Sequence, residues 1–117
     1  MDMRHISMPA PVASQSHGTA TDFINAINAQ LVWMEHQKKS GEAIRVFYGG
    51  AFGVFRAIRI SAERADFLRV VVRSDDDRIH SIIAPLSQCS IMLSFVVPSK
   101  DKPEEKVILG FAEPDKK

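Results

Sequence analysis

The sequence holds one cysteine, one tryptophan and one tyrosine in 117 residues. Cys89 therefore has no partner within the chain, so an intramolecular disulfide is excluded and a reducing compartment is expected. No stretch approaches the ~18 consecutive apolar residues that a transmembrane helix needs. Residues 1–20 lack the apolar core of a secretory signal. We therefore expect a cytoplasmic protein that does not associate with membranes.

An excess of one charge is also missing, because 15 Lys and Arg residues face 14 Asp and Glu residues for a net charge of +1. This balance argues against a protein that coats nucleic acid non-specifically. The distribution is uneven: seven of the eight arginines lie between residues 45 and 78, where Glu63, Asp66 and the aspartates at 75–77 nearly neutralise them. Two roles stay open for these arginines, namely contact with phosphates and pairing with neighbouring carboxylates in solvent.

Spacings typical of a metal site or a catalytic group are missing too. His5, His17, His36 and His80 share no metal-ligand spacing with one another or with Cys89. No Ser-His-Asp or Cys-His grouping is visible, and the scattered acidic residues make no carboxylate pair. We expect a protein without catalysis, metal or cofactor, in which Cys89 is a small buried hydrophobe.

Composition and periodicity divide the chain into one domain, residues 19–112, and two tails. Residues 1–18 are rich in Met, Pro, Ala and Ser without helical or strand periodicity, which is typical of a disordered tail. Residues 113–117 form the second disordered tail. The domain is short enough for association with copies of itself to be a natural supplement to its core.

A helix is predicted over residues 20–39. Thr19 is suited to cap it with Asp22 at the third helical position, and Gly41 is suited to close it. Val32 and Trp33 lie off the apolar stripe, so they form either a contact surface for another subunit or a partly covered face beside the chain's own sheet. The stripe consists of Ala20, Phe23, Ile24, Ile27, Leu31 and Met34.

From residue 43 the apolar residues alternate with period two, which is the signature of a small all-β unit. In the third run, Leu68, Val70 and Val72 share one face and Arg69 and Arg73 the other. In the fifth run, "SIMLSFVV", residues 91, 93, 95 and 97 share a face. The predicted strands are 43–49, 52–61, 66–73, 78–84, 90–97 and 106–112.

The segment "RVFYGGAFGVFRAIRI" at 45–60 is the most distinctive stretch. A phosphate-binding glycine loop needs a helix after it, whereas residues 54–60 favour a strand. Gly49 and Gly50 instead fit a two-residue hairpin turn with positive φ, and Gly53 fits a bulge or a close backbone approach. Residues 74–77, "SDDD", are predicted to form a polar hairpin turn.

Tyr48 and Phe52 flank the predicted glycine turn, so they are the aromatics expected to be partly exposed and able to stack on nucleotide bases. His80 is expected on a strand beside Arg78, facing solvent. The candidate nucleic-acid contacts are Arg45, Tyr48, Phe52, Arg56, Arg59, Arg69, Arg73, Arg78 and His80.

The order of these segments resembles the Sm-like superfamily over about residues 20–97. The resemblance rests on a helix, a first strand "IRVFY", a glycine turn, a long second strand, "ADFLRVVV" as the third strand and "HSIIAPLSQCSIML" as the fourth strand, tight turn and fifth strand. It implies a mainly β fold: an N-terminal helix followed by a small, strongly bent five- to six-stranded antiparallel barrel. It also implies assembly into a ring through strand edges.

We therefore expect a homo-oligomeric Sm-like ring that binds single-stranded RNA. Apolar edge strands such as those at 78–84 and 90–97 invite pairing, and a closed ring satisfies them. The alternative is a protein-interaction or structural subunit built on the same barrel without nucleic acid. A third option is a barrel that binds a small anionic ligand.

Overall fold

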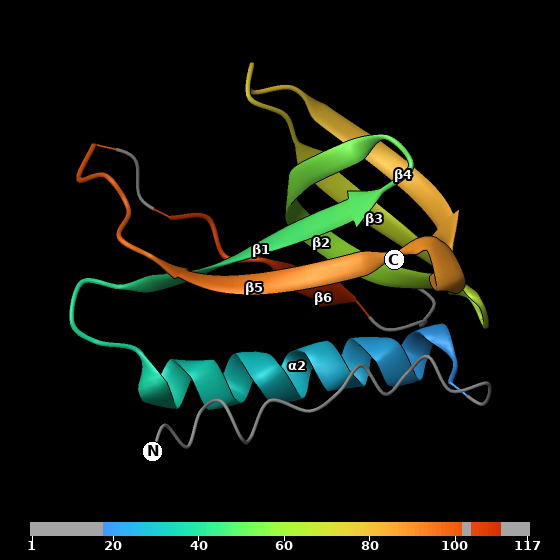
Figure 1. The fold of residues 1–117 in the computed structure, drawn as a ribbon, viewed down its shortest axis with the longest axis horizontal. Helices are drawn as coiled ribbons and strands as arrows, with labels where there is room; N and C mark the ends of the chain where they lie inside the picture. The colour runs from blue at the N-terminus through green and yellow to red at the C-terminus, as the bar shows by residue number, and fades with distance from the viewer. Residues whose placement is uncertain (1–17, 102–103, 111–117) are drawn as a thin grey trace.

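The structure is a computed structural model that describes residues 18–101 and 104–110. One helix precedes a sheet of six strands, so the protein is mainly β, as predicted (Figure 1). The predicted tails at 1–18 and 113–117 lie almost wholly outside the described residues. The elements are α2 (Ala20–Gln37), β1 (Ala43–Gly50), β2 (Gly53–Arg64), β3 (Phe67–Arg73), β4 (Ile79–Pro85), the short 3-10 helix η2 (Leu86–Gln88), β5 (Ser90–Val96) and β6 (Ile108–Gly110).

Helix α2 begins at the predicted capping box. The Asp22 backbone N–H donates to Thr19 Oγ1 at 3.1 Å, and the Thr19 backbone N–H donates to Asp22 Oδ2 at 3.2 Å. The helix ends at Gln37, two residues before the predicted end. Gly41 (φ +85°) lies beyond it, at the third position of a turn in which the Glu42 N–H donates to the Lys39 carbonyl at 3.0 Å.

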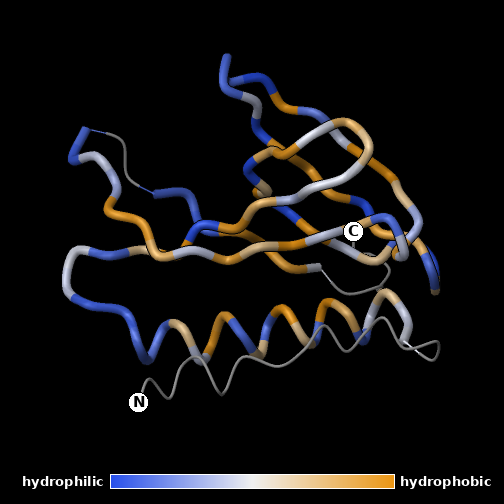
Figure 2. Tube along the Cα trace, viewed as in Figure 1, coloured by the Kyte–Doolittle hydropathy of each residue, from blue (hydrophilic) through white to orange (hydrophobic). Residues whose placement is uncertain are grey.

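The apolar stripe of α2 packs under the sheet, with its hydrophobic residues facing the strands (Figures 1 and 2). Ala20, Ile24, Ile27 and Met34 are buried, while Phe23 and Leu31 are partly buried against the core. Of the two residues off the stripe, Val32 is 50% exposed and Trp33 is half-buried. The predicted stripe is confirmed.

The main sheet runs in the order β4-β3-β2-β1-β5, with every neighbouring pair antiparallel. Among the described residues β4 and β5 do not pair, so the sheet is open and the expected closed barrel is not confirmed. The last strand also differs from the prediction of an all-antiparallel sheet. Strand β6 pairs in parallel with residues 59–61 of β2.

The parallel pairing of β6 follows from the length of β2. Strand β2 spans 12 residues, and its first part pairs with β1 through residues 53–56. Its register against β3 shifts between Ala57 and Arg59 and again between Ala62 and Arg64, and such irregularities bend a strand. β1 is not paired with β2 beyond Arg56, so the edge of β2 at 59–61 is free for β6.

The core lies on one face of the sheet, against α2. Val46 and Tyr48 on β1 are 1% exposed. On β3, Leu68, Val70 and Val72 are each 0% exposed, which confirms the predicted face. Residues 91 and 93 of β5 also pack against this core, as the alternation in "SIMLSFVV" predicts.

The first hairpin turn lies two residues after the predicted one. Gly50 pairs with Gly53, so Ala51 and Phe52 form the turn, and Gly49 lies inside β1. The positive φ expected at Gly49 and Gly50 occurs instead at Gly53 (+117°). The predicted turn at 74–77 is confirmed, with the Asp77 N–H donating to the Ser74 carbonyl at 2.8 Å.

Position 50 requires a glycine because the Tyr48 ring lies across it. A Cβ on Gly50 would lie 2.7 Å from Tyr48 Cζ, which is closer than atoms can pack, whereas a Cβ on Gly49 would have its nearest neighbour, Val54 Cγ2, at 3.8 Å. We expect Gly50→Ala to lower the free energy of unfolding by about 1–3 kcal/mol, because Tyr48 is buried and has little room to move. Gly49→Ala, the matched control, changes it by less than about 0.5 kcal/mol.

Urea unfolding of both variants measures this difference. Equal stabilities for the two alanine variants would contradict the packing of Tyr48 over Gly50.

Candidate functional site

Three arginines form a row on the outer face of the sheet, opposite the core. Arg45 lies on β1 two residues from Phe47, and Phe47 pairs with Arg56 on β2. Arg56 in turn pairs with Arg73 on β3. Directly opposed residues share a face, so the register places Phe47, Arg56 and Arg73 side by side across three strands.

Residues 104–107 precede β6 and have no regular secondary structure; we call them the strap. The strap places the Glu104 carboxylate within hydrogen-bond distance of Arg45 and Arg56. Arg45 Nη2 donates to Oε1 at 2.7 Å and Arg45 Nε donates to Oε2 at 3.0 Å, while Arg56 Nη2 donates to Oε2 at 2.8 Å. Glu104 is 6% exposed at its side chain, so this ion pair is largely shielded from solvent.

The next strap residue, Glu105, binds Arg73. Its Oε1 accepts from Arg73 Nε at 3.2 Å and its Oε2 accepts from Arg73 Nη2 at 3.3 Å. Arg73 also donates through Nη1 to Asp77 Oδ1 at 3.0 Å. The Glu105 side chain is 45% exposed, so its pair is better solvated than that of Glu104.

The ion pairs change the acidity of both partners. The hydrogen bond from Arg45 holds the pKa of Glu104 below its ordinary value of 4.5, against the opposing effect of burial. The same hydrogen bond raises the pKa of Arg45. Both shifts favour the ionised forms of Arg45 and Glu104 at neutral pH.

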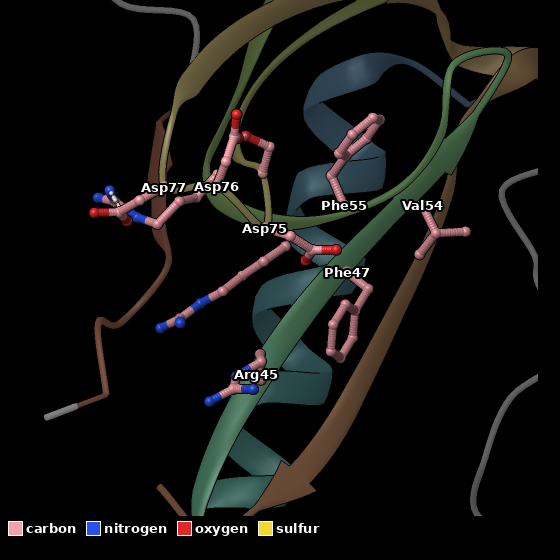
Figure 3. Close-up of a pocket in the computed structure, with 10 residues that line it drawn as sticks. Arg45, Phe47, Val54, Phe55, Asp75, Asp76 and Asp77 are labelled. Atoms are coloured by element: carbon pink, nitrogen blue, oxygen red, sulfur yellow. Dashed lines mark hydrogen bonds and ion pairs between the residues drawn. The ribbon is translucent and has the colours of Figure 1, made fainter. Parts of the chain in front are cut away.

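A cleft of about 610 Å³ adjoins this cluster (Figure 3). The three arginines line it together with apolar side chains of β1 and β2, and the β3–β4 turn supplies its acidic rim. Asp75 has no hydrogen-bond or ion-pair partner within the described part of the chain. The lining residues are Arg45, Phe47, Val54, Phe55, Arg56, Arg73, Ser74, Asp75, Asp76 and Asp77.

Two further predicted contacts also have carboxylate partners. Arg69 Nη2 lies 3.1 Å from Glu63 Oε1, and Arg78 Nε lies 3.3 Å from Asp76 Oδ2. Arg59 is exposed and has no ion pair among residues 18–101 and 104–110. Most of the arginines therefore pair with carboxylates, and Arg69, Arg73 and Arg78 find a partner within the arginine-rich stretch itself.

Sequence reasoning missed the strap. The acidic neighbours Glu63, Asp76 and Asp77 lie within the arginine-rich stretch, but Glu104 lies 59 residues from Arg45 and 48 from Arg56. The available signal was the pair Glu104-Glu105 immediately before the last apolar run.

The two candidate stacking aromatics differ. Phe52 is 73% exposed at the tip of the first hairpin, as predicted. The predicted exposure of Tyr48 is wrong, because it alternates onto the core face of β1 and is 1% exposed. Burial and the neighbouring Cys89 raise the pKa of Tyr48, so its phenol stays protonated. His80 is exposed on β4, opposite Val72.

Cys89 is a free, half-buried thiol that packs against the core. Its Sγ donates to the Pro85 carbonyl at 3.3 Å, and burial raises the pKa of the thiol. A protonated thiol is a weak nucleophile, so this geometry suits a packing role.

The described residues contain no group of histidine, cysteine, aspartate or glutamate side chains arranged to hold a metal ion. His5 and His17 lie outside the described residues. Within the same part of the chain, no helix has the length and apolarity needed to cross a membrane.

Comparison with known proteins gives no relative. The chain matches no protein-family model, no curated protein and no solved structure at a significant level. The Sm-like resemblance therefore stays a prediction, and the site is interpreted from its geometry.

Glu104→Gln tests the energetic role of the strap. We expect the free energy of unfolding to fall by about 1–3 kcal/mol at neutral pH, because charge-assisted hydrogen bonds to two arginines are weakened. The folded-state pKa of Glu104 lies below its ordinary 4.5, so this stabilisation is fully present above about that pH and is lost as the pH falls through the lowered pKa.

Urea unfolding of both proteins between neutral and acidic pH measures the difference. It should shrink on acidification, and a difference that grew towards low pH would contradict this role.

Proposed function

We propose that the protein is a non-enzymatic structural or interaction subunit that assembles with copies of itself into a ring. The supporting observation is that the open sheet has two outer strands, β4 and β5, each paired on one side only within the described residues. A strand of this kind presents a row of unpaired N–H and C=O groups, which favours pairing with another chain.

The side chains on these strands favour burial at an interface. On β4, Ile79 is 57% and Ile83 is 53% exposed. On β5, Met92 is 55% exposed. Large apolar side chains repeated along an outer strand, without an interrupting lysine, are unusual for a monomer that protects its edges.

The two edges favour a head-to-tail arrangement. If β4 of one copy pairs with β5 of the next, both edges of every copy are satisfied, whereas a two-fold dimer through β4 alone leaves each β5 open. Repeated head-to-tail contacts close into a ring when the rotation between copies allows it. The open sheet and its two edges therefore support a ring better than a dimer.

The Sm-like relationship belongs to the same proposal. A helix followed by five antiparallel strands in the order β4-β3-β2-β1-β5 agrees with the architecture that the resemblance implies. The single free cysteine suits assembly in the reducing cytoplasm.

The mass in solution tests the assembly. The chain has a mass of 13.0 kDa, and light scattering after size exclusion is expected to give a discrete multiple of it. Ile83→Lys or Met92→Lys should reduce the mass to that of the monomer, because a charge cannot be buried unpaired at an edge. Val32→Lys is the matched control, since Val32 is 50% exposed on helix α2 and belongs to neither outer strand.

A wild-type mass of 13.0 kDa at micromolar concentration would refute the assembly. An equal effect of the Val32 variant would show that the added charge acts without regard to the edges.

RNA binding is the second candidate, and the exposure of Phe52 and Arg59 favours it. Phe52 is 73% exposed, and Arg59 has no ion pair within the described ranges. An exposed aromatic and a free guanidinium are the groups that hold single strands without sequence preference. Arg45, Arg56, Arg69, Arg73 and Arg78 already have carboxylate partners, so they would have to exchange them for phosphates.

Fluorescence anisotropy with a labelled single-stranded RNA tests this candidate. Phe52→Ala should weaken binding by about 1–3 kcal/mol, the usual contribution of one stacked base. Arg59→Gln should lower the slope of affinity against salt by about one. Glu63→Gln frees Arg69 and serves as the opposite control, with binding unchanged or stronger. Affinity that is insensitive to both salt and Phe52 would exclude an RNA surface at these residues.

A further inference from the structure

The arginine row needs an anion to be stable. Arg56 and Arg73 stand directly opposite each other on β2 and β3, a position in which like charges repel. Arg45 reaches the same carboxylate as Arg56 from the other side. The two strap carboxylates, Glu104 and Glu105, supply this negative charge.

The donors around Glu104 match those that bind a phosphate group. Three N–H groups from Arg45 and Arg56 converge on its two oxygens at 2.7 to 3.0 Å, and two of them come from one guanidinium fork. Arginine forks bind carboxylate and phosphate oxygens in the same bidentate way. A phosphate carries more charge than a carboxylate, so the same donors would hold it at least as well.

The strap is the least firmly held part of this network. It has no regular secondary structure, and the strand that follows it, β6, has three paired positions on β2. The Glu105 side chain is 45% exposed. Short segments with few backbone hydrogen bonds open at lower free energy than the core strands, so the strap can leave while the arginines stay on β1, β2 and β3.

The adjoining cleft offers space and contacts for the sugar and base of a nucleotide. Its volume of about 610 Å³ lies in the range of small-molecule sites. Phe47 shares the outer face with Arg56 and lines the cleft, so it offers a ring for a base. Phe55, opposite Tyr48, instead packs against the core. Asp75 also lines the cleft and has no partner among the described residues, so its carboxylate is available to accept N–H groups of a base.

We propose that Arg45, Arg56 and Arg73 form a binding site for the phosphate group of a nucleotide, and that Glu104 and Glu105 occupy this site in the ligand-free protein. The nucleotide is either free or part of a single-stranded RNA. The strap competes within the same molecule, so the wild-type affinity is lowered by the fraction of molecules in which the site is open. This site lies on the inner three strands and does not depend on pairing at β4 or β5.

Glu104→Gln tests the site, because it removes the charge of the competing group and keeps its shape. Isothermal titration calorimetry with adenosine 5′-monophosphate is expected to give a dissociation constant at least about tenfold lower for this variant than for the wild type. The gain must vanish with adenosine, which lacks the phosphate, and in the double variant Glu104→Gln/Arg45→Gln. A parallel titration with single-stranded oligoadenylate identifies the source: a gain with the monophosphate assigns a free nucleotide, and a gain with the oligonucleotide alone assigns RNA.

The same affinity for variant and wild type with both ligands would overturn the proposal. A gain that persists without the phosphate or without Arg45 would overturn it too. Glu63→Gln is the matched control, since Glu63 also pairs with an arginine, Arg69, but lies outside the cleft, and it should leave the affinity for adenosine 5′-monophosphate unchanged.

If Glu104→Gln does not fold, Glu105→Gln decides the question. Its side chain is 45% exposed, so this variant should fold and should still free Arg73 from one partner. We expect a gain of a few-fold in affinity for one of the two ligands, and its absence would overturn the proposal. Light scattering of each variant separates this result from the assembly, because a change of mass is no part of the expected effect.

Discussion

Strand β2 determines the arrangement of the sheet, because a strand has two edges and β2 shares them among three neighbours. One edge pairs with β3 along most of its length. The other pairs first with β1 through residues 53–56 and then with β6 through residues 59–61. The register shifts at residues 57–59 and 62–64 bend β2, and β1 is unpaired with it beyond Arg56. The position of the strap follows from this division.

The strap has to approach β2 beside the point where β1 ends its pairing. Arg56 is the last residue of β2 that pairs with β1, and the strap carboxylates lie at that position. Arginines from three strands therefore pair at this position with carboxylates from a segment that is distant in the sequence. The burial of the Glu104 side chain makes this contact costly to leave unpaired, since a shielded carboxylate without its arginines would be poorly solvated.

Local patterns in the sequence predicted what depends on local physics. The capping box at Thr19, the stripe of α2 and the buried face of β3 each follow from a spacing of a few residues, and each is confirmed. The errors concern contacts that no spacing encodes. Gly50 was assigned to a turn because a glycine pair favours positive φ, but it is needed for the approach of the Tyr48 ring. Tyr48 itself is buried because it alternates onto the core face of β1.

The sequence predicts the arginines of the candidate site but not the strap carboxylates that pair with them. The arginines are visible in one stretch of sequence, and alternation along β3 correctly places Arg73 on the outer face. Their partners were not predictable, because Glu104 lies in a charged turn whose path is set by where β6 finds a free edge. Periodicity determines the face of a side chain, whereas tertiary pairing determines the charge that it meets.

The proposed assembly and the proposed ligand binding use separate parts of the same sheet. The free edges belong to the outer strands β4 and β5, and the arginine row belongs to β1, β2 and β3 between them. Pairing at the outer strands would therefore not use the strands that carry the arginine row. The two interactions also differ in their response to salt. Contacts between apolar edge strands persist as ionic strength rises, whereas ion pairs with exposed members such as Arg73 and Glu105 weaken. Salt would also weaken the proposed phosphate binding at the same guanidiniums. Raising the salt concentration therefore weakens both the ion pairs of the strap and the binding of the competing phosphate. A change in the charge of Glu104 affects the two interactions differently.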